Sequence, residues 1–425
     1  MLIQFTVGNF LSFKEKVTLS MVKSALHELP ENVIKIDDDF ELLKSAVIYG
    51  ANASGKSNLI KALAFMKLFT VSSFKLQIDE ELGIYSFLLN EETKDGPSFF
   101  EIVFIIDSVT YRYGFEADKK KVKKEWLYYT PKTKEEKLFD REGSVFNISP
   151  EFLEGFALEN KTRENCLFLT VVSQFNGEIS AKIIKWFNKL RVITSRDYQT
   201  FLFRTLTRFE QEPNLKENII KFISVADNGV EDFEIESINT PIDQVNKNML
   251  GEKKDLKIKV VKFIHRVFNI NKQVVGKKDL LIDYFESEGT KKMFALSVPV
   301  VDALRNSEII VVDELENHLH PLLLKHIIKL FNSSSNKNNA QLIFTTHNLT
   351  CMSHECFRRD QIWFTEKNSF GESSLFPLAD YKIEKKKIRS DATYSKDYLL
   401  GKYGAVPFID DIDLSFKEKD NEPSK

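Results

Sequence analysis

The chain has 425 residues, of which 43% are hydrophobic, and a formal net charge of -2. The length predicts about two structural units, and 36 phenylalanines with only 16 glycines and 11 prolines exclude a disordered or low-complexity chain. The charge gives no global footprint for nucleic acid, no run of 18 apolar residues predicts a membrane span, and the three cysteines lack metal-site spacing, so we expect a cytoplasmic protein.

The N-terminal segment predicts three short strands, a glycine-containing loop and a helix. β-branched and aromatic residues mark the strands at 2–7, 17–21 and 45–49. After the loop, the sequence SNLIKALAFMKLF places apolar residues at helical spacing. The loop is therefore expected between a strand and a helix.

This loop, residues 50–57, reads GANASGKS and matches the pattern G-x-x-x-x-G-K-[ST]. Its glycines let consecutive backbone N–H groups and the helix N-terminus face bound phosphates. Lys56 would reach the β- and γ-phosphates, and the Ser57 hydroxyl would ligate Mg²⁺. The pattern predicts a site for ATP and Mg²⁺, whose nucleotide-binding residues are Asn52, Ala53, Ser54, Gly55, Lys56, Ser57 and Asn58.

A second group of strands is predicted at 99–106, 110–116 and 125–130, as an antiparallel meander. The basic run KKKVKK at 119–124 lies between two of these strands. We expect it to be a solvated hairpin tip, and a patch that faces DNA is the alternative.

From about 132 to 280 the chain becomes more helical and charged, with helices expected at 178–190 and 214–226. It contains no internal repeat and no sustained heptad, so a long coiled-coil arm is not expected. We expect this segment to form a compact insertion.

Strand signals return at 308–312 and 341–345, as continuous apolar runs that are typical of strands buried on both faces of a parallel sheet. Asp313 and Glu314 end the first of them. Asp313 would hold Mg²⁺ from the strand beside the glycine loop, and Glu314 would act as the general base on the attacking water. His347, after the second strand, would hydrogen-bond the γ-phosphate or that water.

Lys56 and Asp313 are 257 residues apart (313 − 56), so a large insertion must separate the two halves of the nucleotide site. Between them, the sequence ESEGTKKMF at 286–294 predicts the start of a helix, with Ser287 as N-cap and Gly289 permitting close approach. A helix N-terminus attracts anions, yet the phosphates of this chain are already assigned to the glycine loop.

The order of these features resembles the ABC-type ATPases of the RecF, SMC and Rad50 kind: glycine loop, insertion, helix start, acid pair and histidine. The opening FTVGNFLSF is similar to the first strands of that group. The resemblance implies an α/β fold, a P-loop NTPase of ABC-ATPase type with an antiparallel β subdomain and a compact helical insertion. It divides the chain into two halves of the ATPase domain at 1–131 and 281–385, a mainly helical insertion at 132–280 and a C-terminal tail at 386–425.

In those ATPases a signature serine contacts the γ-phosphate bound by the other subunit. The resemblance therefore implies a homodimer or higher homo-oligomer, in which Ser287, Gly289 and Thr290 act on the nucleotide of a second copy. The signature reads S-E-G-T, whereas transporters have S-G-G-Q. Gln77 is a candidate for the Q-loop, and metal binding by the pair His318 and His320 is not expected.

The chain also resembles the stand-alone ATPases of bacterial abortive-infection operons, which include AbiLi-like proteins and the ATPase subunit of PARIS systems. These ATPases act in anti-phage defence, and the resemblance implies a separate toxic effector such as a nuclease. The stretches that carry it are 97–118, 286–294, 311–321, 358–368 and 397–409.

Four functions compete on these features. An ATP-driven sensor or scaffold in anti-phage defence is favoured, and a DNA repair or recombination clamp of the RecF or Rad50 kind, which binds DNA, is the alternative. A self-contained nuclease is disfavoured because the sequence after His347 is too short for a nuclease domain, and Asp411 and Asp413 form a D-x-D in a polar tail. A transporter subunit is disfavoured because neither a coupling surface nor a typical signature is visible.

Overall fold

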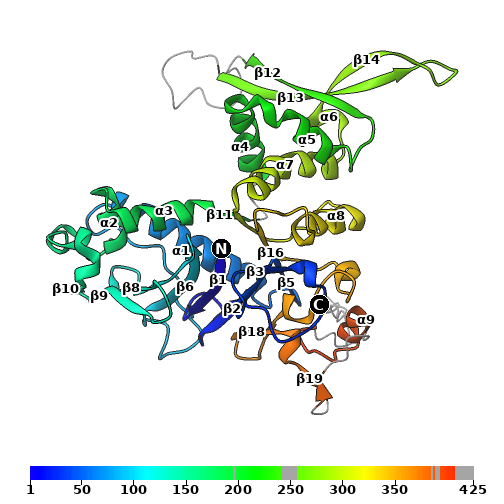
Figure 1. The fold of residues 1–425 in the computed structure, drawn as a ribbon. Coiled ribbons are helices and arrows are strands. Elements are labelled where there is room, and N and C mark those ends of the chain that lie inside the picture. The colour runs from blue at the N-terminus through cyan, green and yellow to red at the C-terminus, as the bar shows by residue number, and fades with distance from the viewer. Residues whose placement is uncertain (195–197, 241–255, 384–385, 388–392, 407–425) are drawn as a thin grey trace, which may run out of the picture.

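The computed structural model describes residues 1–194, 198–240, 256–383, 386–387 and 393–406. Two β-sheets lie side by side in the lower part of Figure 1, and a third unit stands above one of them. The strands of the N-terminal part are β1 (Leu2–Gly8), β2 (Val17–Ser20), β3 (Val33–Lys35), β4 (Glu41–Leu43), β5 (Ser45–Gly50), β6 (Ser98–Ile106), β7 (Val109–Ala117), β8 (Val122–Thr130), β9 (Glu136–Glu142) and β10 (Val145–Ile148). The helices of the first half are α1 (Lys56–Ser72), α2 (Phe168–Gln174) and α3 (Glu178–Lys189).

Beyond these elements the chain alternates between the second sheet and the upper unit. The strands are β11 (Leu190–Ile193), β12 (Val230–Thr240), β13 (Leu256–Phe268), β14 (Val274–Leu281), β15 (Ile309–Val312), β16 (Gln341–Thr345), β17 (Ile362–Lys367), β18 (Ser373–Pro377), β19 (Lys382–Ile383) and β20 (Lys386–Lys387). The helices are α4 (Tyr198–Gln211), α5 (Lys216–Ile223), α6 (Ile282–Phe285), α7 (Glu288–Asn306), α8 (Pro321–Asn332) and α9 (Tyr394–Leu399).

The first sheet has seven antiparallel strands in the order β10-β9-β8-β7-β6-β1-β2. Phe100, Ile102 and Phe104 alternate along β6 and are fully buried, as the period of two requires for one core-facing side. The five strands predicted for this region are confirmed, and the basic run predicted as a hairpin tip turns at Asp118 and Lys121 between β7 and β8.

The second sheet has the strand order β11-β15-β16-β5-β17-β18, and its strands are parallel except for the hairpin of β17 and β18. Residues of β5 alternate between two cores: Ala46 and Ile48 belong to the core shared with the first sheet, and Val47 and Tyr49 to the opposite one. Every residue of β5, β15 and β16 is buried. This explains their continuous apolar sequences, because both faces of a parallel sheet are covered.

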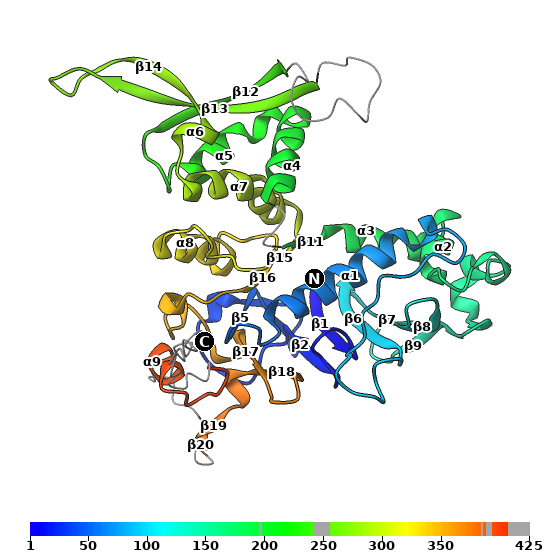
Figure 2. The same cartoon turned by 180° about the vertical axis from the view of Figure 1, so that it is seen from behind.

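Helix α1 fills the space between the two sheets. Its side chains Leu59, Leu63 and Met66 are buried in the same core as β6 and one face of β5. Helices α7, α8 and α9 contribute to the core on the other face of the second sheet. The loop that joins β5 to α1 is therefore attached at both ends to packed elements, which are labelled in Figure 2.

The expectation of a single, mainly helical insertion at 132–280 was wrong. Strands β9 and β10 extend the first sheet, β11 joins the second, and β12, β13 and β14 form a three-stranded sheet of their own. The sequence of β12, VEDFEIESINT, alternates apolar and polar residues, which is the pattern of a strand with one buried face. Its buried face packs on α4, α5 and α7. We call α4, α5, α6 and these three strands the arm.

The segment expected as a C-terminal tail also differs. Helix α9 and the turn after it are part of the core, because Tyr394, Tyr398 and Tyr403 are buried. The Tyr398 ring stacks 5.5 Å from that of Phe364. Asp411 and Asp413 lie outside the described residues. Within the described ranges, no helix is both long enough and apolar enough to cross a membrane.

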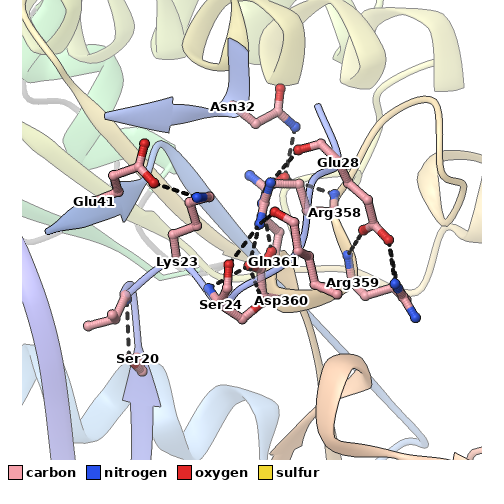
Figure 3. A network of polar contacts seen from close by, with 12 residues as sticks. Ser20, Lys23, Ser24, Glu28, Asn32, Glu41, Arg358, Arg359, Asp360 and Gln361 are labelled. Atoms are coloured by element: carbon pink, nitrogen blue, oxygen red, sulfur yellow. Dashed lines mark hydrogen bonds and ion pairs between the residues drawn. The ribbon is translucent and has the colours of Figure 1, made fainter. Parts of the chain in front are cut away.

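A buried polar network fixes the N-terminal segment against the second sheet (Figure 3). The Arg358 side chain is 1% exposed, pairs with Asp360 at 2.8 Å and donates to the Leu26 carbonyl at 3.1 Å. Asp360 also accepts from the Ser24 backbone N–H at 2.9 Å. The neighbouring Gln361 amide donates to the Ser45 carbonyl at 3.1 Å, so the network reaches the first residue of β5.

Candidate nucleotide-binding site

The predicted phosphate loop lies between the end of β5 and the start of α1, as its sequence indicated. A side chain at Gly50 would place its Cβ 2.4 Å from the Thr365 carbonyl oxygen, and at Gly55 (φ 118°) it would lie 2.6 Å from the Ser373 hydroxyl. Both glycines are therefore required by close approach to β17 and β18. The backbone turns within the loop, where the Ser54 N–H donates to the Ala51 carbonyl at 3.2 Å.

Lys56 lies over this turn and is buried. Its Nζ donates to the carbonyls of Gly50 and Ala51, both at 2.9 Å. Burial lowers the pKa of Lys56 to about 8, and the charges of Asp313, Glu316 and Glu314 oppose that shift. A buried ammonium group in a glycine-containing loop at a helix N-terminus has the chemistry of a polyphosphate site.

Three hydroxyl residues that the sequence did not single out hold the loop in place. The Ser54 and Thr365 hydroxyls are hydrogen-bonded at 2.6 Å. Asn58 donates to the Ser12 hydroxyl at 2.8 Å, and the Ser373 hydroxyl donates to the Ser54 carbonyl at 2.7 Å. Ser12 and Ser373 are 361 residues apart in sequence and 2.8 Å apart in space, so only the fold could reveal them. Asn52 and Ala53 are exposed at the outer end of the loop.

We expected the acid pair to follow the strand next to β5, and this was wrong. Strand β16 lies between β5 and β15, the strand that the acid pair follows. Asp313 follows β15 and is buried, and its Oδ1 accepts from the Thr345 hydroxyl at 2.7 Å. The same hydroxyl accepts from the Glu314 backbone N–H at 2.7 Å. Thr345 of β16 therefore bridges both acids to the strand that neighbours β5. The sequence could not set this strand order because continuous apolar runs carry no pairing information.

His347 and Glu316 form the third side of the site. The His347 backbone N–H donates to Oε1 of Glu316, and the other carboxylate oxygen, Oε2, is buried with no hydrogen-bond partner among the described residues. Burial and the nearby charge of Lys56 lower the pKa of His347, so its imidazole is neutral at pH 7. Glu316 was missed in the sequence, although a third carboxylate in DELE was the available signal.

The structure thus brings Lys56, Asp313, Glu314 and His347 together, since each affects the titration of Lys56 or His347. Ser57 is the second residue of α1, next to Lys56. The Ser57 hydroxyl and the Asp313 carboxylate are hard oxygen ligands, which is the donor set that Mg²⁺ prefers. The residues present therefore fit both a triphosphate and its metal ion.

The helix predicted at Ser287 is confirmed as α7. The Ser287 hydroxyl accepts from the Thr290 backbone N–H at 3.1 Å, which is an N-cap. A Cβ at Gly289 would lie 2.8 Å from the His318 carbonyl, so this glycine allows close approach as expected. The helix thereby packs on the loop that follows the acid pair.

Lys292 adds a second link between α7 and the acids. Its Nζ donates to the carbonyls of Glu314 and Leu315 at 3.2 and 3.0 Å, and burial lowers its pKa to about 8. A cavity of about 220 Å³ lies between α7 and the end of β15, with Lys292, Asp313 and Glu314 in its wall. The position of α7 and the geometry of the acid pair are therefore coupled within one chain.

Of the other candidates, His318 lines the cavity beside the acid pair, and Gln77 and His320 have different contacts. The Gln77 side chain is exposed, and its backbone contacts Glu80 and Asn165. His320 caps α8 by accepting from the Leu322 N–H at 3.2 Å. Among the described residues, no group of three or more histidine, cysteine or acidic side chains could hold a metal ion.

Residues 45–353, more than half of the chain, match the family model described as "AAA domain, putative AbiEii toxin, Type IV TA system". The match contains the phosphate loop, Ser287, the acid pair and His347. The chain belongs to this family of AAA-type ATPases. It is therefore a P-loop, nucleotide-binding ATPase with a mixed α/β fold.

This ATPase has no match among the curated proteins. Among solved structures it is similar to an SMC head bound to the C-winged helix domain of ScpA, with 15% identity, 90% of this chain and 99% of that chain covered, and a TM-score of 0.48. The SMC head domain from Thermotoga maritima has 14% identity, coverage of 90% and 99%, and a TM-score of 0.41. An Smc head domain with an extended coiled coil, bound to the C-terminal domain of ScpA derived from Pyrococcus furiosus, has 13% identity, coverage of 88% and 96%, and a TM-score of 0.43.

Proposed function

We propose that this ATPase hydrolyses ATP with Mg²⁺ at the site formed by the phosphate loop, the acid pair and His347. The observation that carries the proposal is the buried Lys56 after β5, together with Asp313 and Glu314, which Thr345 links to the neighbouring strand β16 although they lie in a distant part of the sequence. A cation and several carboxylates gathered at the carboxyl ends of parallel strands suit binding of a metal–triphosphate complex.

Each residue has a defined part in this proposal. Backbone N–H groups of Asn52 to Asn58 and the Lys56 ammonium bind the phosphates, which stabilises charge that develops on them. Ser57 and Asp313 would hold Mg²⁺, which would supply positive charge against the phosphate oxygens. The Glu314 carboxylate takes the proton from the attacking water. His347, neutral at pH 7, hydrogen-bonds the terminal phosphate. Glu316 orients the His347 backbone by accepting its N–H.

A second copy of the chain completes the site in this proposal. Ser287, Gly289 and Thr290 form a helix N-terminus, to which anions are attracted. They would contact the nucleotide bound by the other copy, so that a homodimer or higher homo-oligomer closes around ATP. Hydrolysis is then slow in the isolated subunit.

The biological role we propose is an ATP-driven sensor or scaffold in anti-phage defence, which controls a separate toxic effector such as a nuclease. The description of the family, which names a toxin of a type IV toxin–antitoxin system, supports a role of this kind. The sequence stretches that resemble abortive-infection ATPases support it further.

The chemical part is tested with Glu314→Gln. This substitution keeps the size of the side chain and removes the base, so we expect at least about 100-fold slower ATP hydrolysis with unchanged ATP affinity. Hydrolysis is measured by phosphate release and affinity by calorimetry, with Lys56→Ala as the variant that loses binding and Glu91→Gln, an exposed carboxylate, as the matched control. Full turnover by Glu314→Gln would refute its role.

The biological part is tested by phage challenge of bacteria that express the ATPase with its neighbouring genes. Protection should require Lys56, and the wild-type protein should co-purify with a cleaving partner. Unchanged protection by Lys56→Ala would contradict the defence role. Binding to DNA ends without any such partner would favour the repair or recombination clamp.

A further inference from the structure

The arm ends in a two-stranded ribbon that projects from the molecule. Strand β12 pairs with β13 only as far as Val230 and His265, so residues 266–277 form a hairpin of β13 and β14 with no third strand. We call residues 266–280, which include the base of this hairpin, the ribbon. Figures 1 and 2 show this ribbon extending beyond all other elements of the arm. Two-stranded ribbons alone are marginally stable in water, so a surface that packs on this one would stabilise it.

The ribbon exposes a group of apolar side chains that are close together in sequence. Ile270 at the tip is 98% exposed, and the others are between 39% and 59% exposed: Val267, Phe268, Val274 and Val275. Strand β14 is also the edge of its sheet, and none of the described strands pairs with its outer side. A grouped apolar surface beside an open strand edge is typical of a site where an extended segment adds as a further strand.

The ribbon is basic although the whole chain has a net charge of -2. Residues 266–280 contain four basic residues and one acidic residue, Asp279. The basic residues are Arg266, Lys272, Lys277 and Lys278. Glu231 of β12 pairs with Arg266 at 3.1 Å and with Lys277 at 2.9 Å. Lys272 and Lys278 take part in no ion pair among the described residues. A complementary segment must therefore be extended, apolar and acidic.

One segment of this chain has that composition. Residues 408–416 read FIDDIDLSF, in which Ile412, Leu414 and Phe416 alternate with Asp411 and Asp413. This is the alternation of a strand with one apolar and one acidic face. The segment lies outside the described residues, and only its sequence enters here. We propose that residues 408–416 of a second copy pair with the outer edge of β14 and cover the apolar ribbon.

The segment comes from a second copy because its own chain does not reach the ribbon. Val406 follows α9, and α9 lies at the opposite end of the molecule from the ribbon, with α8 and α7 between them (Figures 1 and 2). The chain from Val406 to Ile412 spans at most about 22 Å. The two helices, each about 10 Å across, already take up this length.

Duplex DNA is a less suitable ligand for the ribbon. Only Lys272 and Lys278 remain for phosphate contacts, whereas proteins that bind duplexes make about 6–10 of them. In a complex with duplex DNA, the apolar side chains of the ribbon would remain exposed to solvent in the DNA groove. An acidic, apolar protein segment satisfies both features at once.

The test uses the full chain and a fluorescent peptide of residues 407–425. The chain carries Ile412→Asp and Leu414→Asp, so that its own segment does not compete. We expect micromolar binding of the peptide, measured by fluorescence anisotropy without nucleotide. Val275→Asp and Lys278→Glu should each weaken binding at least tenfold, and Lys120→Glu, an exposed lysine outside the arm, should leave it unchanged.

Charge exchange makes the test specific. A peptide with Asp411→Lys should bind Lys278→Glu more tightly than it binds the parent chain. The proposal would be overturned if the peptide did not bind or if a scrambled peptide bound equally well. It would also be overturned if a 20-base-pair duplex or phosphatidylglycerol vesicles bound the chain and Val275→Asp abolished that binding. Lys56→Ala should bind the peptide normally, so this result is independent of ATP hydrolysis.

Discussion

At the scale of single residues, Lys56 shows how burial prepares the site for a charged ligand. Water is excluded from its ammonium group, and its two hydrogen bonds go to carbonyls of the phosphate loop. The neighbouring carboxylates only partly compensate, so its pKa is about 8 instead of the usual value for lysine. A triphosphate would bring the missing negative charge.

Nucleotide binding should therefore take up a proton in mildly alkaline solution. At pH 8.5 most of the Lys56 is neutral in the free protein, and bound phosphates raise its pKa, so we expect uptake of roughly three-quarters of a proton. At pH 7 the group is already charged and uptake should be close to zero. Calorimetry of Mg-ATP binding in buffers of different ionisation enthalpy measures the proton uptake at pH 8.5 and at pH 7. Equal uptake at the two pH values would contradict this account.

In the proposed mechanism, Glu316 acts through His347, whose backbone N–H donates to its carboxylate. Removing its carboxylate in Glu316→Ala leaves the His347 N–H without its acceptor, and hydrogen bonds to charged groups contribute about 1.5–3 kcal/mol. We expect kcat to fall about tenfold or more with little change in KM. Glu316→Gln keeps an acceptor oxygen and should retain most of the rate. A rise in KM alone would show that Glu316 contacts the substrate.

At the scale of elements, the segments around β5 are fixed by buried polar contacts as much as by apolar packing. Arg358 and Asp360 lie just before β17 and bind the loop that contains Ser24 and Leu26. Breaking one partner of a buried ion pair leaves an uncompensated charge, which destabilises a protein by about 3–5 kcal/mol. The stretch RRDQ at 358–361 therefore has a role in stability that is independent of catalysis.

Arg358→Met should accordingly lower the free energy of unfolding by about 3 kcal/mol, because Asp360 remains buried without its partner. Chemical denaturation measures the change. Lys35→Met removes an exposed ion pair with Asp38 and serves as the control, with an expected loss below about 0.5 kcal/mol. Equal effects of the two substitutions would contradict the structural role of Arg358.

At the scale of the whole molecule, α7 belongs to two cores. Phe294 and Val298 pack against the arm, and the Phe294 ring lies 5.2 Å from Phe233 and 5.4 Å from Phe263. Met293 and Leu296, on the other face of the helix, pack against the second sheet. Any shift of α7 therefore moves the arm relative to the acid pair or deforms one of the two cores.

The two faces of α7 can be tested separately. Phe294→Ala removes a fully buried ring, at a cost of about 3–5 kcal/mol, from the arm core only. Amide hydrogen exchange should become faster in β12 and β13 and stay unchanged in β15 and β16. Met293→Ala, its neighbour, should give the opposite pattern. Faster exchange in all four strands from either substitution would show a single cooperative core.

Local motifs were predictable from sequence, and long-range arrangement was not. The phosphate loop, the strands before it and the N-cap at Ser287 depend on neighbouring residues, so their patterns identified them. The interposition of β16 between β5 and β15, and the contact of Ser12 with Ser373, depend on pairings across hundreds of residues. The strands of the arm were not predicted, because the helical spacing at 178–190 and 214–226 was taken to hold for the whole segment 132–280.

The parallel neighbours of β5 come late in the chain. Strand β5 ends at Gly50, whereas β16 begins at Gln341 and β17 follows it, so most of the chain is synthesised before either can pair with β5. At roughly 5–20 residues per second, a ribosome needs about 15–60 s for the intervening segment. During translation β5 therefore has neither of its parallel neighbours, and nascent chains should gain affinity for ATP only after β16 and β17 have been synthesised.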